Sequence, residues 1–321
     1  MKFNMTKTFL FYILIVSVMI SVSSNNWMMI WSGLEISLMS FIPLMSEGMI
    51  GSESSMKYFI VQSVSSSMLI ISILMIISLN FSFNYVMLIS LLMKMGVAPF
   101  HNWVLSIINS LSFKLMFILF SLMKIVPLLM LSYLNSYNDL FIILSLIIGS
   151  LFSLNQNSIR KLLGYSSIYN MSYMISCINM NTVWVIYLLM YSLVLILLLI
   201  LISKLKINYI NQFMINEKSM IMKFNLMVSV MSLGGLPPLL GFFPKFIIFQ
   251  MMVKKKLFIL MIFMILTSLL VMFFYMRMMF VMFLNYSTML KIITKISLKL
   301  SILPLFFNTN IFFFIIWFKH I

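Results

Sequence analysis

Residues 229–246, SVMSLGGLPPLLGFFPKF, interrupt a long apolar run with three glycines, three prolines and one lysine. Proline removes a backbone donor and clashes with the preceding turn, so no regular helix continues through this stretch. In hydrocarbon, such a break is tolerated only where protein or a water-filled cavity covers the freed backbone groups. A lysine beside a broken helix is typical of transporter ion sites, which makes Lys245 a candidate. The alternative is a surface loop whose lysine reaches the membrane interface.

The composition around this stretch predicts an all-α polytopic membrane protein. The chain has 321 residues, of which 63% are hydrophobic and 8% are charged, and its mean hydropathy is +1.16. Repeated apolar runs of about 20 residues are typical of membrane helices, and they lack the period-two alternation of a barrel. The net charge of +16 comes from lysines scattered between the runs, so no nucleic-acid partner is predicted. A lone cysteine, Cys177, leaves no internal disulfide and too few thiolates for an iron–sulfur cluster.

The apolar runs predict about 11 transmembrane helices. Their approximate ranges are 8–24, 27–46, 57–80, 84–105, 112–133, 138–155, 161–179, 182–203, 223–252, 257–284 and 300–318. This count puts thirteen basic residues on the side of the N-terminus and only four on the other side, namely Lys254, Lys255, Lys256 and Lys319. The asymmetry predicts that the N-terminus lies inside and the C-terminus outside.

Five charged residues lie deep within these runs, away from their ends: Glu35, Lys94, Lys124, Lys245 and Arg277. Each charge at a helix centre costs about 2.5–3.5 kcal/mol on insertion scales, so intramembrane charges indicate function. Glu35 lies roughly eight residues from either end of its run, about 12 Å of helix, which is more than a glutamate can snorkel. The alternative is a carboxylate that pairs with a lysine only to hold the helices together. Arg277 is better read as such a structural pair or as a snorkelling side chain.

Lys94 and Lys124 each lie beside a helix-breaking residue. Gly96 and Pro99 follow Lys94, so its run mirrors the interruption near Lys245, and paired interruptions point to a transport site. Pro127 follows Lys124 and frees a carbonyl about one turn upstream, which can solvate an ammonium or a water. His101 is a secondary candidate for a proton relay, or an interfacial histidine bonded to backbone. No nucleophile with a partnered base and no nucleotide-binding fingerprint is present.

Several stretches together resemble a known family. They include WSGLEISLMSFIPLMS, MKYFIVQS, LLMKMGVAPFHNW, MKIVP, LNQNSIRKLLGYSSIYNMSYM and SLGGLPPLLGFFPK. In order and spacing these are similar to the subunit 2 family of mitochondrial NADH dehydrogenase, antiporter-like membrane subunits of respiratory complex I. After about residue 285 only the hydrophobicity is similar. Family members usually carry a Pro-Glu pair where this chain has Leu105 and Ser106, and often a polar residue at Met123.

The resemblance implies a fold of two inverted-repeat five-helix bundles, each with one broken helix, plus a C-terminal helix. The bundles would cover about 8–133 and 138–284, and the terminal helix about 300–318. It also implies a proton path through Glu35, Lys94, Lys124 and Lys245, the same residues that the energetic cost of burial selects.

The implied function is that of a proton-translocating core subunit of mitochondrial NADH:ubiquinone oxidoreductase, an enzyme in which this chain carries no redox centre. NADH, FMN, iron–sulfur clusters and ubiquinone are expected on other subunits. Expected partners are other complex I membrane subunits, including neighbouring antiporter-like ones, and membrane lipids. The expected location is the mitochondrial inner membrane, with the N-terminus in the matrix and the C-terminus in the intermembrane space. Two alternatives remain: a stand-alone cation/proton antiporter, and a membrane scaffold whose buried charges only pair.

Overall fold

The structure, a computed structural model, describes residues 5–46, 48–79, 83–134, 138–180, 182–215 and 220–284. Throughout these residues the regular secondary structure is helical, and the exception is one isolated bridge between Ser158 and Tyr209. Helices satisfy their own backbone hydrogen bonds, as hydrocarbon requires. The chain divides into two compact units, Met1–Ser145 and Leu146–Ile321, and each is considered by itself. The bundle limits expected from the sequence stay a prediction.

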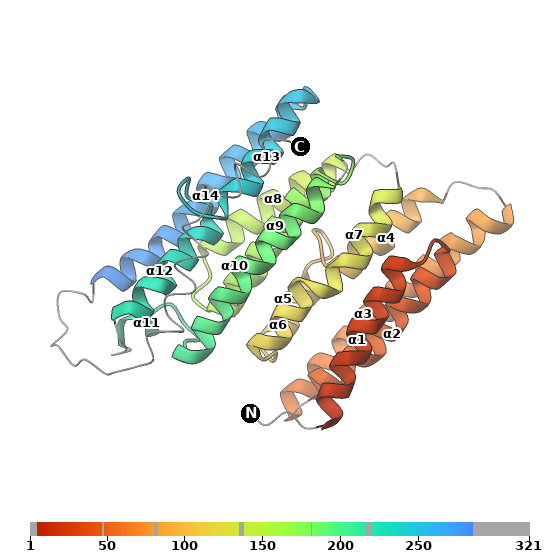
Figure 1. The fold of residues 1–321 in the computed structure, drawn as a ribbon, viewed down its shortest axis with the longest axis horizontal. Helices are drawn as coiled ribbons and strands as arrows, with labels where there is room; N and C mark the ends of the chain where they lie inside the picture. Colours follow the sequence, from red (N-terminus) through yellow and green to blue (C-terminus); the bar gives the residue numbers. More distant parts are fainter. Residues whose placement is uncertain are drawn as a thin grey trace. The chain divides into compact units, whose positions relative to one another are not determined.

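Unit 1 is built around a central helix, α7. Its helices are α1 (Met5–Ser23), α2 (Trp27–Met45), α3 (Gly48–Leu79), α4 (Asn84–Met95), α5 (Asn102–Ile108), α6 (Phe113–Phe120) and α7 (Leu122–Tyr133). α1 packs along α2, α2 along α3, and α3 against α4 and α5 (Figure 1). α7 contacts α1, α2 and α4, so side chains from several helices converge on it. α8 (Asp139–Leu154) begins in this unit and ends in the next.

Unit 2 contains the second interrupted helix. Its helices are α9 (Ile159–Ser176), α10 (Val183–Leu205), α11 (Gln212–Ile215), α12 (Met220–Gly234), α13 (Phe242–Lys254) and α14 (Phe258–Leu284). Both α12 and α13 contact α10 and α14. The two halves of the broken helix therefore share the same neighbours, although Pro237 and Pro238, within the break between Gly234 and Phe242, are exposed.

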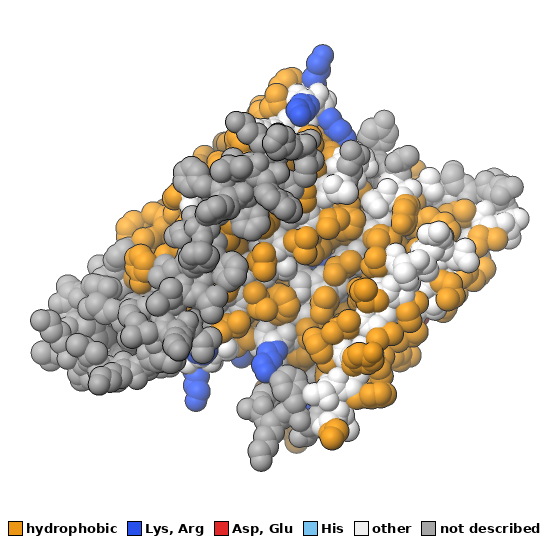
Figure 2. All heavy atoms as spheres, in the orientation of Figure 1, with side chains coloured by type: hydrophobic (Ala, Val, Ile, Leu, Met, Phe, Trp, Pro, Cys, Tyr) orange, Lys and Arg blue, Asp and Glu red, His pale blue; other side chains and the backbone are white. Residues whose placement is uncertain are grey.

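The described residues include six helices long and apolar enough to cross a membrane. They are Met5–Ser23, Trp27–Met45, Gly48–Ser78, Phe113–Tyr133, Val183–Leu205 and Phe258–Met282. Large apolar side chains face outward on them, such as Phe9 on α1 and Phe273 on α14, and Figure 2 shows apolar atoms over much of the visible surface. The prediction of an all-helical, multi-pass membrane protein is confirmed. The count of 11 and the inverted repeat stay predictions, and the run 300–318 lies outside the described residues.

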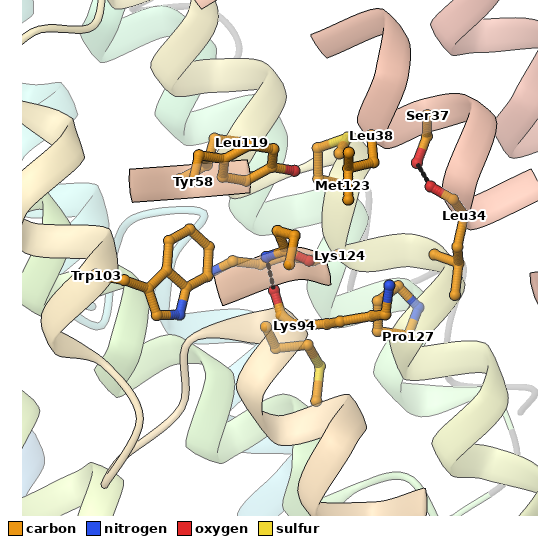
Figure 3. Close-up of a pocket in the computed structure, with 12 residues that line it drawn as sticks. Leu34, Ser37, Leu38, Tyr58, Lys94, Trp103, Leu119, Met123, Lys124 and Pro127 are labelled. Carbon is orange, nitrogen blue, oxygen red and sulfur yellow. Dashed lines mark hydrogen bonds between the residues drawn. The ribbon is translucent and has the colours of Figure 1, made fainter. Parts of the chain in front are cut away.

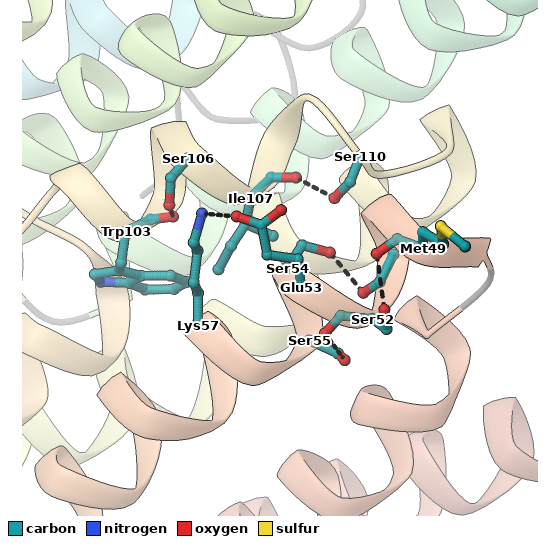
Figure 4. Close-up of polar contacts among 11 residues, drawn as sticks. Met49, Ser52, Glu53, Ser54, Ser55, Lys57, Trp103, Ser106, Ile107 and Ser110 are labelled. Atoms are coloured by element: carbon teal, nitrogen blue, oxygen red, sulfur yellow. Dashed lines mark hydrogen bonds and ion pairs between the residues drawn. The ribbon is translucent and has the colours of Figure 1, made fainter.

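α3 is longer than the apolar run that predicted it. We expected the span to begin near residue 57, whereas the helix begins at Gly48 and has 32 residues. At 1.5 Å per residue it is about 48 Å long, which exceeds a hydrocarbon core of about 30 Å. Its early turns carry an exposed ion pair between Glu53 and Lys57, with 2.5 Å between Oε1 and Nζ (Figure 4). A count of apolar residues misses these turns because they are polar, although they are helical.

Candidate functional site

Glu35 and Lys94 face each other inside unit 1. Glu35 lies in the middle of α2 and Lys94 in the last turn of α4, and Lys94 Nζ is 3.9 Å from Glu35 Oε1. The Lys94 side chain is 4% exposed and the Glu35 side chain is 24% exposed. Glu35 Oε1 is buried and accepts no hydrogen bond from the described residues. Since charge-assisted hydrogen bonds are about 2.7–2.9 Å long, this pair is an electrostatic contact with room to tighten or part.

Helix α4 ends one residue after Lys94, at the interruption that the sequence predicted. Gly96 adopts φ 68, and a Cβ at this position would run into Val104 and Trp103, so glycine is required. The carbonyl groups freed at the break have donors from other helices. Gln62 Nε2 on α3 donates to the carbonyl of Lys94 at 3.2 Å, and Trp103 Nε1 on α5 donates to that of Met93 at 3.1 Å. These bonds fix the backbone that carries Lys94.

Lys124 is buried in the same unit without a carboxylate partner within salt-bridge distance among the described residues. It lies in the first turns of α7, its side chain is buried, and its Nζ lies 5.4 Å from the ring centre of Phe120. The sequence pointed to Pro127, which frees a carbonyl about one turn upstream, and the structure adds an interruption at Ser121, where α6 ends and α7 begins. The proline itself is accommodated within α7, so the helix interruption lies just before Lys124.

A cavity of about 30 Å³ is lined by the two buried lysines of the described part of unit 1, Lys94 and Lys124. Figure 3 shows Lys94 and Lys124 at its wall, and Ser37, Tyr58 and Gln62 add polar groups to the lining. One water needs roughly 10–15 Å³ of such volume and two to four polar partners, so the cavity has room and partners for water. The cavity therefore offers room for water beside both buried lysines.

Lys245 belongs to unit 2 and lies at the other broken helix. From the first turn of α13 it reaches back, and its Nζ donates to the carbonyl of Gly234, the last residue of α12, at 2.9 Å. The C-terminal end of a helix carries partial negative charge, which favours a cation there. Gly235 adopts φ 85, and a Cβ at this position would lie 2.8 Å from Lys245 Nζ.

The remaining two candidates bond to backbone. His101 lies between α4 and α5, and its Nδ1 is 3.1 Å from the carbonyl oxygen of Pro99. Arg277 on α14 donates through Nη1 to the carbonyl of Leu154 at 2.8 Å and through Nη2 to that of Gln156 at 3.2 Å. The guanidinium thus ties α14 to the C-terminal end of α8, a structural contact of the kind the sequence favoured.

Comparisons of the sequence with known proteins assign this chain to a family. The profile of the NADH:quinone oxidoreductase/Mrp antiporter transmembrane family matches residues 24–84 and 77–271. The chain is 40% identical over 314 residues to NADH-ubiquinone oxidoreductase chain 2 of Anopheles gambiae, covering 92% of each chain. It is 35% identical to the chain 2 of Locusta migratoria, covering 81% of this chain and 80% of that one. The chain belongs to the NADH-ubiquinone oxidoreductase chain 2 family.

Solved structures share the fold of this chain 2 family member. A chain of respiratory complex I from Thermus thermophilus superposes with a TM-score of 0.80 at 20% identity, over 87% of this chain and 71% of that chain. A chain of the Mrp complex from a Dietzia species gives a TM-score of 0.77 at 16% identity, over 86% of this chain and 59% of that chain. At such low identity the likeness concerns the fold.

In this member of the chain 2 family, the structure shows three further residues that contact the candidate lysines and that the sequence analysis did not single out. Gln62 is a polar side chain within the apolar run of α3, and this position alone could have marked it. Tyr169 and Tyr173 recur at helical spacing on α9, and their rings lie 5.5 and 6.0 Å from Lys245 Nζ. Tyrosine at this spacing is common in packed helices, so the sequence gave no sign of the lysine they contact.

Proposed function

We propose that this chain is the proton-translocating chain 2 of a mitochondrial NADH:ubiquinone oxidoreductase, respiratory complex I. Family membership supports the assignment to that complex. The observation that carries the proton-moving role is the water-sized cavity between buried Lys94 and Lys124, with Glu35 facing Lys94. Charge is costly in a bilayer, and two buried lysines on one cavity, with a carboxylate facing one of them, are typical of a proton relay.

In this proposal, the 3.9 Å contact between Glu35 and Lys94 controls when Lys94 holds its proton and when it releases it. While the carboxylate faces Lys94, it stabilises the charged form of the lysine. When Glu35 moves away or takes up a proton, the buried ammonium loses that stabilisation, and release of its proton becomes easier. Water in the cavity would carry the proton towards Lys124. Lys245, at the broken helix of unit 2, would serve as a further proton site in the same path.

The finer architecture belongs to the same proposal. We infer 11 spans in two inverted five-helix bundles, in the mitochondrial inner membrane, with the N-terminus in the matrix and the C-terminus in the intermembrane space. The lysine asymmetry of the loops supports this orientation. With a single cysteine, the chain would contribute no redox centre, and NADH, FMN, iron–sulfur clusters and ubiquinone would bind other subunits. Its partners would be the neighbouring membrane subunits, antiporter-like ones among them, and lipids.

A native gel of gently solubilised source membranes tests the assignment first. We expect this chain, identified by mass spectrometry, in stoichiometric amount in the band that stains for NADH dehydrogenase activity. In the assembled complex, Lys124→Ala should then reduce proton pumping more than it reduces assembly. Lys254→Ala is the matched control, because this lysine is exposed at the end of α13. Full pumping by assembled Lys124→Ala would remove Lys124 from the path.

A stand-alone cation/proton antiporter is the second candidate, because the matching family also includes Mrp antiporters. The native gel described above distinguishes this candidate from the first. An antiporter of this kind would migrate away from the NADH dehydrogenase band and would exchange ions when purified alone.

A further inference from the structure

Lys245 carries a buried charge that no acidic residue faces within the described part of unit 2. The described residues of unit 2 contain no Asp or Glu, and Lys245 is only 4% exposed. A buried ammonium without compensation is costly, so neutral groups must stabilise it. Lys94 in unit 1 differs in this respect, since Glu35 faces it.

Two tyrosine rings supply part of that stabilisation. Lys245 Nζ lies 5.5 Å from the ring centre of Tyr169 and 6.0 Å from that of Tyr173, both on α9. Aromatic faces attract cations within about 6 Å, and most strongly when both are out of water. Both tyrosines are fully buried. Together with the carbonyl of Gly234 at 2.9 Å, they surround the ammonium with negative electrostatic potential.

The hydroxyl groups of the two tyrosines donate to partners other than the lysine. Tyr169 donates to the hydroxyl oxygen of Tyr173 at 2.8 Å, and Tyr173 donates to the carbonyl oxygen of Met264 on α14 at 3.0 Å. Both hydroxyl protons are therefore committed to bonds that do not involve Lys245. Tyr173 also stacks on Tyr187 of α10, with ring centres 5.8 Å apart. The ring faces, and not the hydroxyl groups, are what the rings offer to the lysine.

We propose that Tyr169 and Tyr173 are positioning residues for Lys245, and that their ring faces and the Gly234 carbonyl take the place of a carboxylate counterion. This inference rests on the proposed function, in which Lys245 holds a proton. It makes the two units different. The charged form of Lys94 is stabilised by a facing carboxylate, whereas Lys245 is held by neutral groups.

The test measures protons pumped per NADH oxidised by the assembled complex in inner-membrane vesicles. Leucine at Tyr169 or Tyr173 removes a ring face, and we expect the ratio to fall by at least about twofold, from the usual strength of a cation–π contact. Phenylalanine keeps the face and loses only the hydroxyl, so Tyr169→Phe and Tyr173→Phe should stay close to the parent. Phe249→Leu is the matched control, because this ring packs on Tyr173, whereas the rings that face Lys245 Nζ are those of Tyr169 and Tyr173. A merely structural role would lower assembly without changing the ratio.

Lys245→Met separates failure of this inference from failure of the proposed function. If Lys245→Met pumps normally, Lys245 lies outside the proton path. Its proposed role as a proton site and the proposed role of the tyrosine rings are then both wrong. If Lys245→Met stops pumping while the leucine variants keep the ratio of the phenylalanine variants, the tyrosine rings are not positioning residues. Where a leucine variant does not assemble, methionine at the same position fills the space flexibly without a ring face and gives the same reading.

Discussion

Lys94 Nζ lies 3.9 Å from Glu35 Oε1, a contact that joins the end of α4 to the middle of α2. Both charges can be located from the sequence, but only their positions in the fold make them partners. The contact is longer than a hydrogen bond and Glu35 Oε1 has no other donor within the described part of the chain. The distance between the two charged groups can therefore change without breaking a hydrogen bond of Glu35 Oε1.

Glu35→Gln should reduce pumping strongly and destabilise the complex modestly. The substitution leaves Lys94 buried and facing a neutral amide. Removing one partner of a fully buried pair costs about 3–5 kcal/mol, and we expect less here because the Glu35 side chain is 24% exposed. Pumping per NADH and the inactivation temperature of the assembled complex measure the two effects separately.

The double substitution Glu35→Gln with Lys94→Met removes both charges and is the control for this pair. We expect it to regain the stability lost by Glu35→Gln, because no unpaired charge remains, while pumping stays low. Recovery of pumping by the double variant would mean that the charges only hold helices together, as a membrane scaffold requires.

Gly235→Ala should impair pumping more than Gly234→Ala. At Gly235 a Cβ would lie 2.8 Å from Lys245 Nζ, and the residue adopts φ 85, which costs an alanine about 1–2 kcal/mol. At Gly234 the nearest contact is the ring of Tyr275 at 3.4 Å, with no unusual φ recorded. The comparison of pumping per NADH uses the same added methyl group at adjacent positions. Equal effects would show that crowding of the helix, and not displacement of the lysine, is responsible.

Gln62→Leu should destabilise the break after Lys94. The carbonyl of Lys94 would lose its donor in a buried site, and an unsatisfied polar group costs about 1–3 kcal/mol. We expect a lower inactivation temperature and a smaller yield of assembled complex on native gels. Ser65→Ala is the control on the same helix, because the Ser65 hydroxyl bonds only to the carbonyl of Gln62 within α3. A Gln62→Leu complex as stable as Ser65→Ala would contradict the role given to this amide.

The sequence predicts the local features of the site and misses the long-range ones. Glycine and proline act on the backbone next to them, so the helix breaks after Lys94 and before Lys245 can be predicted from the sequence. A buried charge is equally visible, because hydrophobic neighbours in sequence mark its depth. The partner of each charge is set by packing between helices, which no periodicity contains. Glu35 could not be matched to Lys94, nor Lys245 to Tyr169, before the fold was known.

Helix ends were predicted least well where polar residues are helical. The start of α3 was placed nine residues late, because Glu53 and its neighbours lower the hydropathy although they extend the helix. The interruption at Ser121 was missed for the opposite reason. Serine carries no strong breaking signal, and Pro127, which does, is accommodated within α7. Hydropathy reports the environment of a segment, whereas helix ends depend on hydrogen bonds.

Arg277→Lys should loosen the attachment of α14 without changing the pumping ratio. The guanidinium donates to the carbonyls of Leu154 and Gln156 from two nitrogens, and this fork cannot be copied by the single nitrogen of a lysine. A hydrogen bond from a charged donor contributes about 1.5–3 kcal/mol, so losing one should lower the inactivation temperature of NADH:ubiquinone activity measurably. Arg277→Met should lower it further, because both carbonyls then lose their donor. Protons pumped per NADH should stay at the parent value in both variants, since the recorded bonds of Arg277 go to backbone carbonyls of unit 2. A changed ratio in a stable Arg277→Lys complex would instead place this arginine among the residues that move protons.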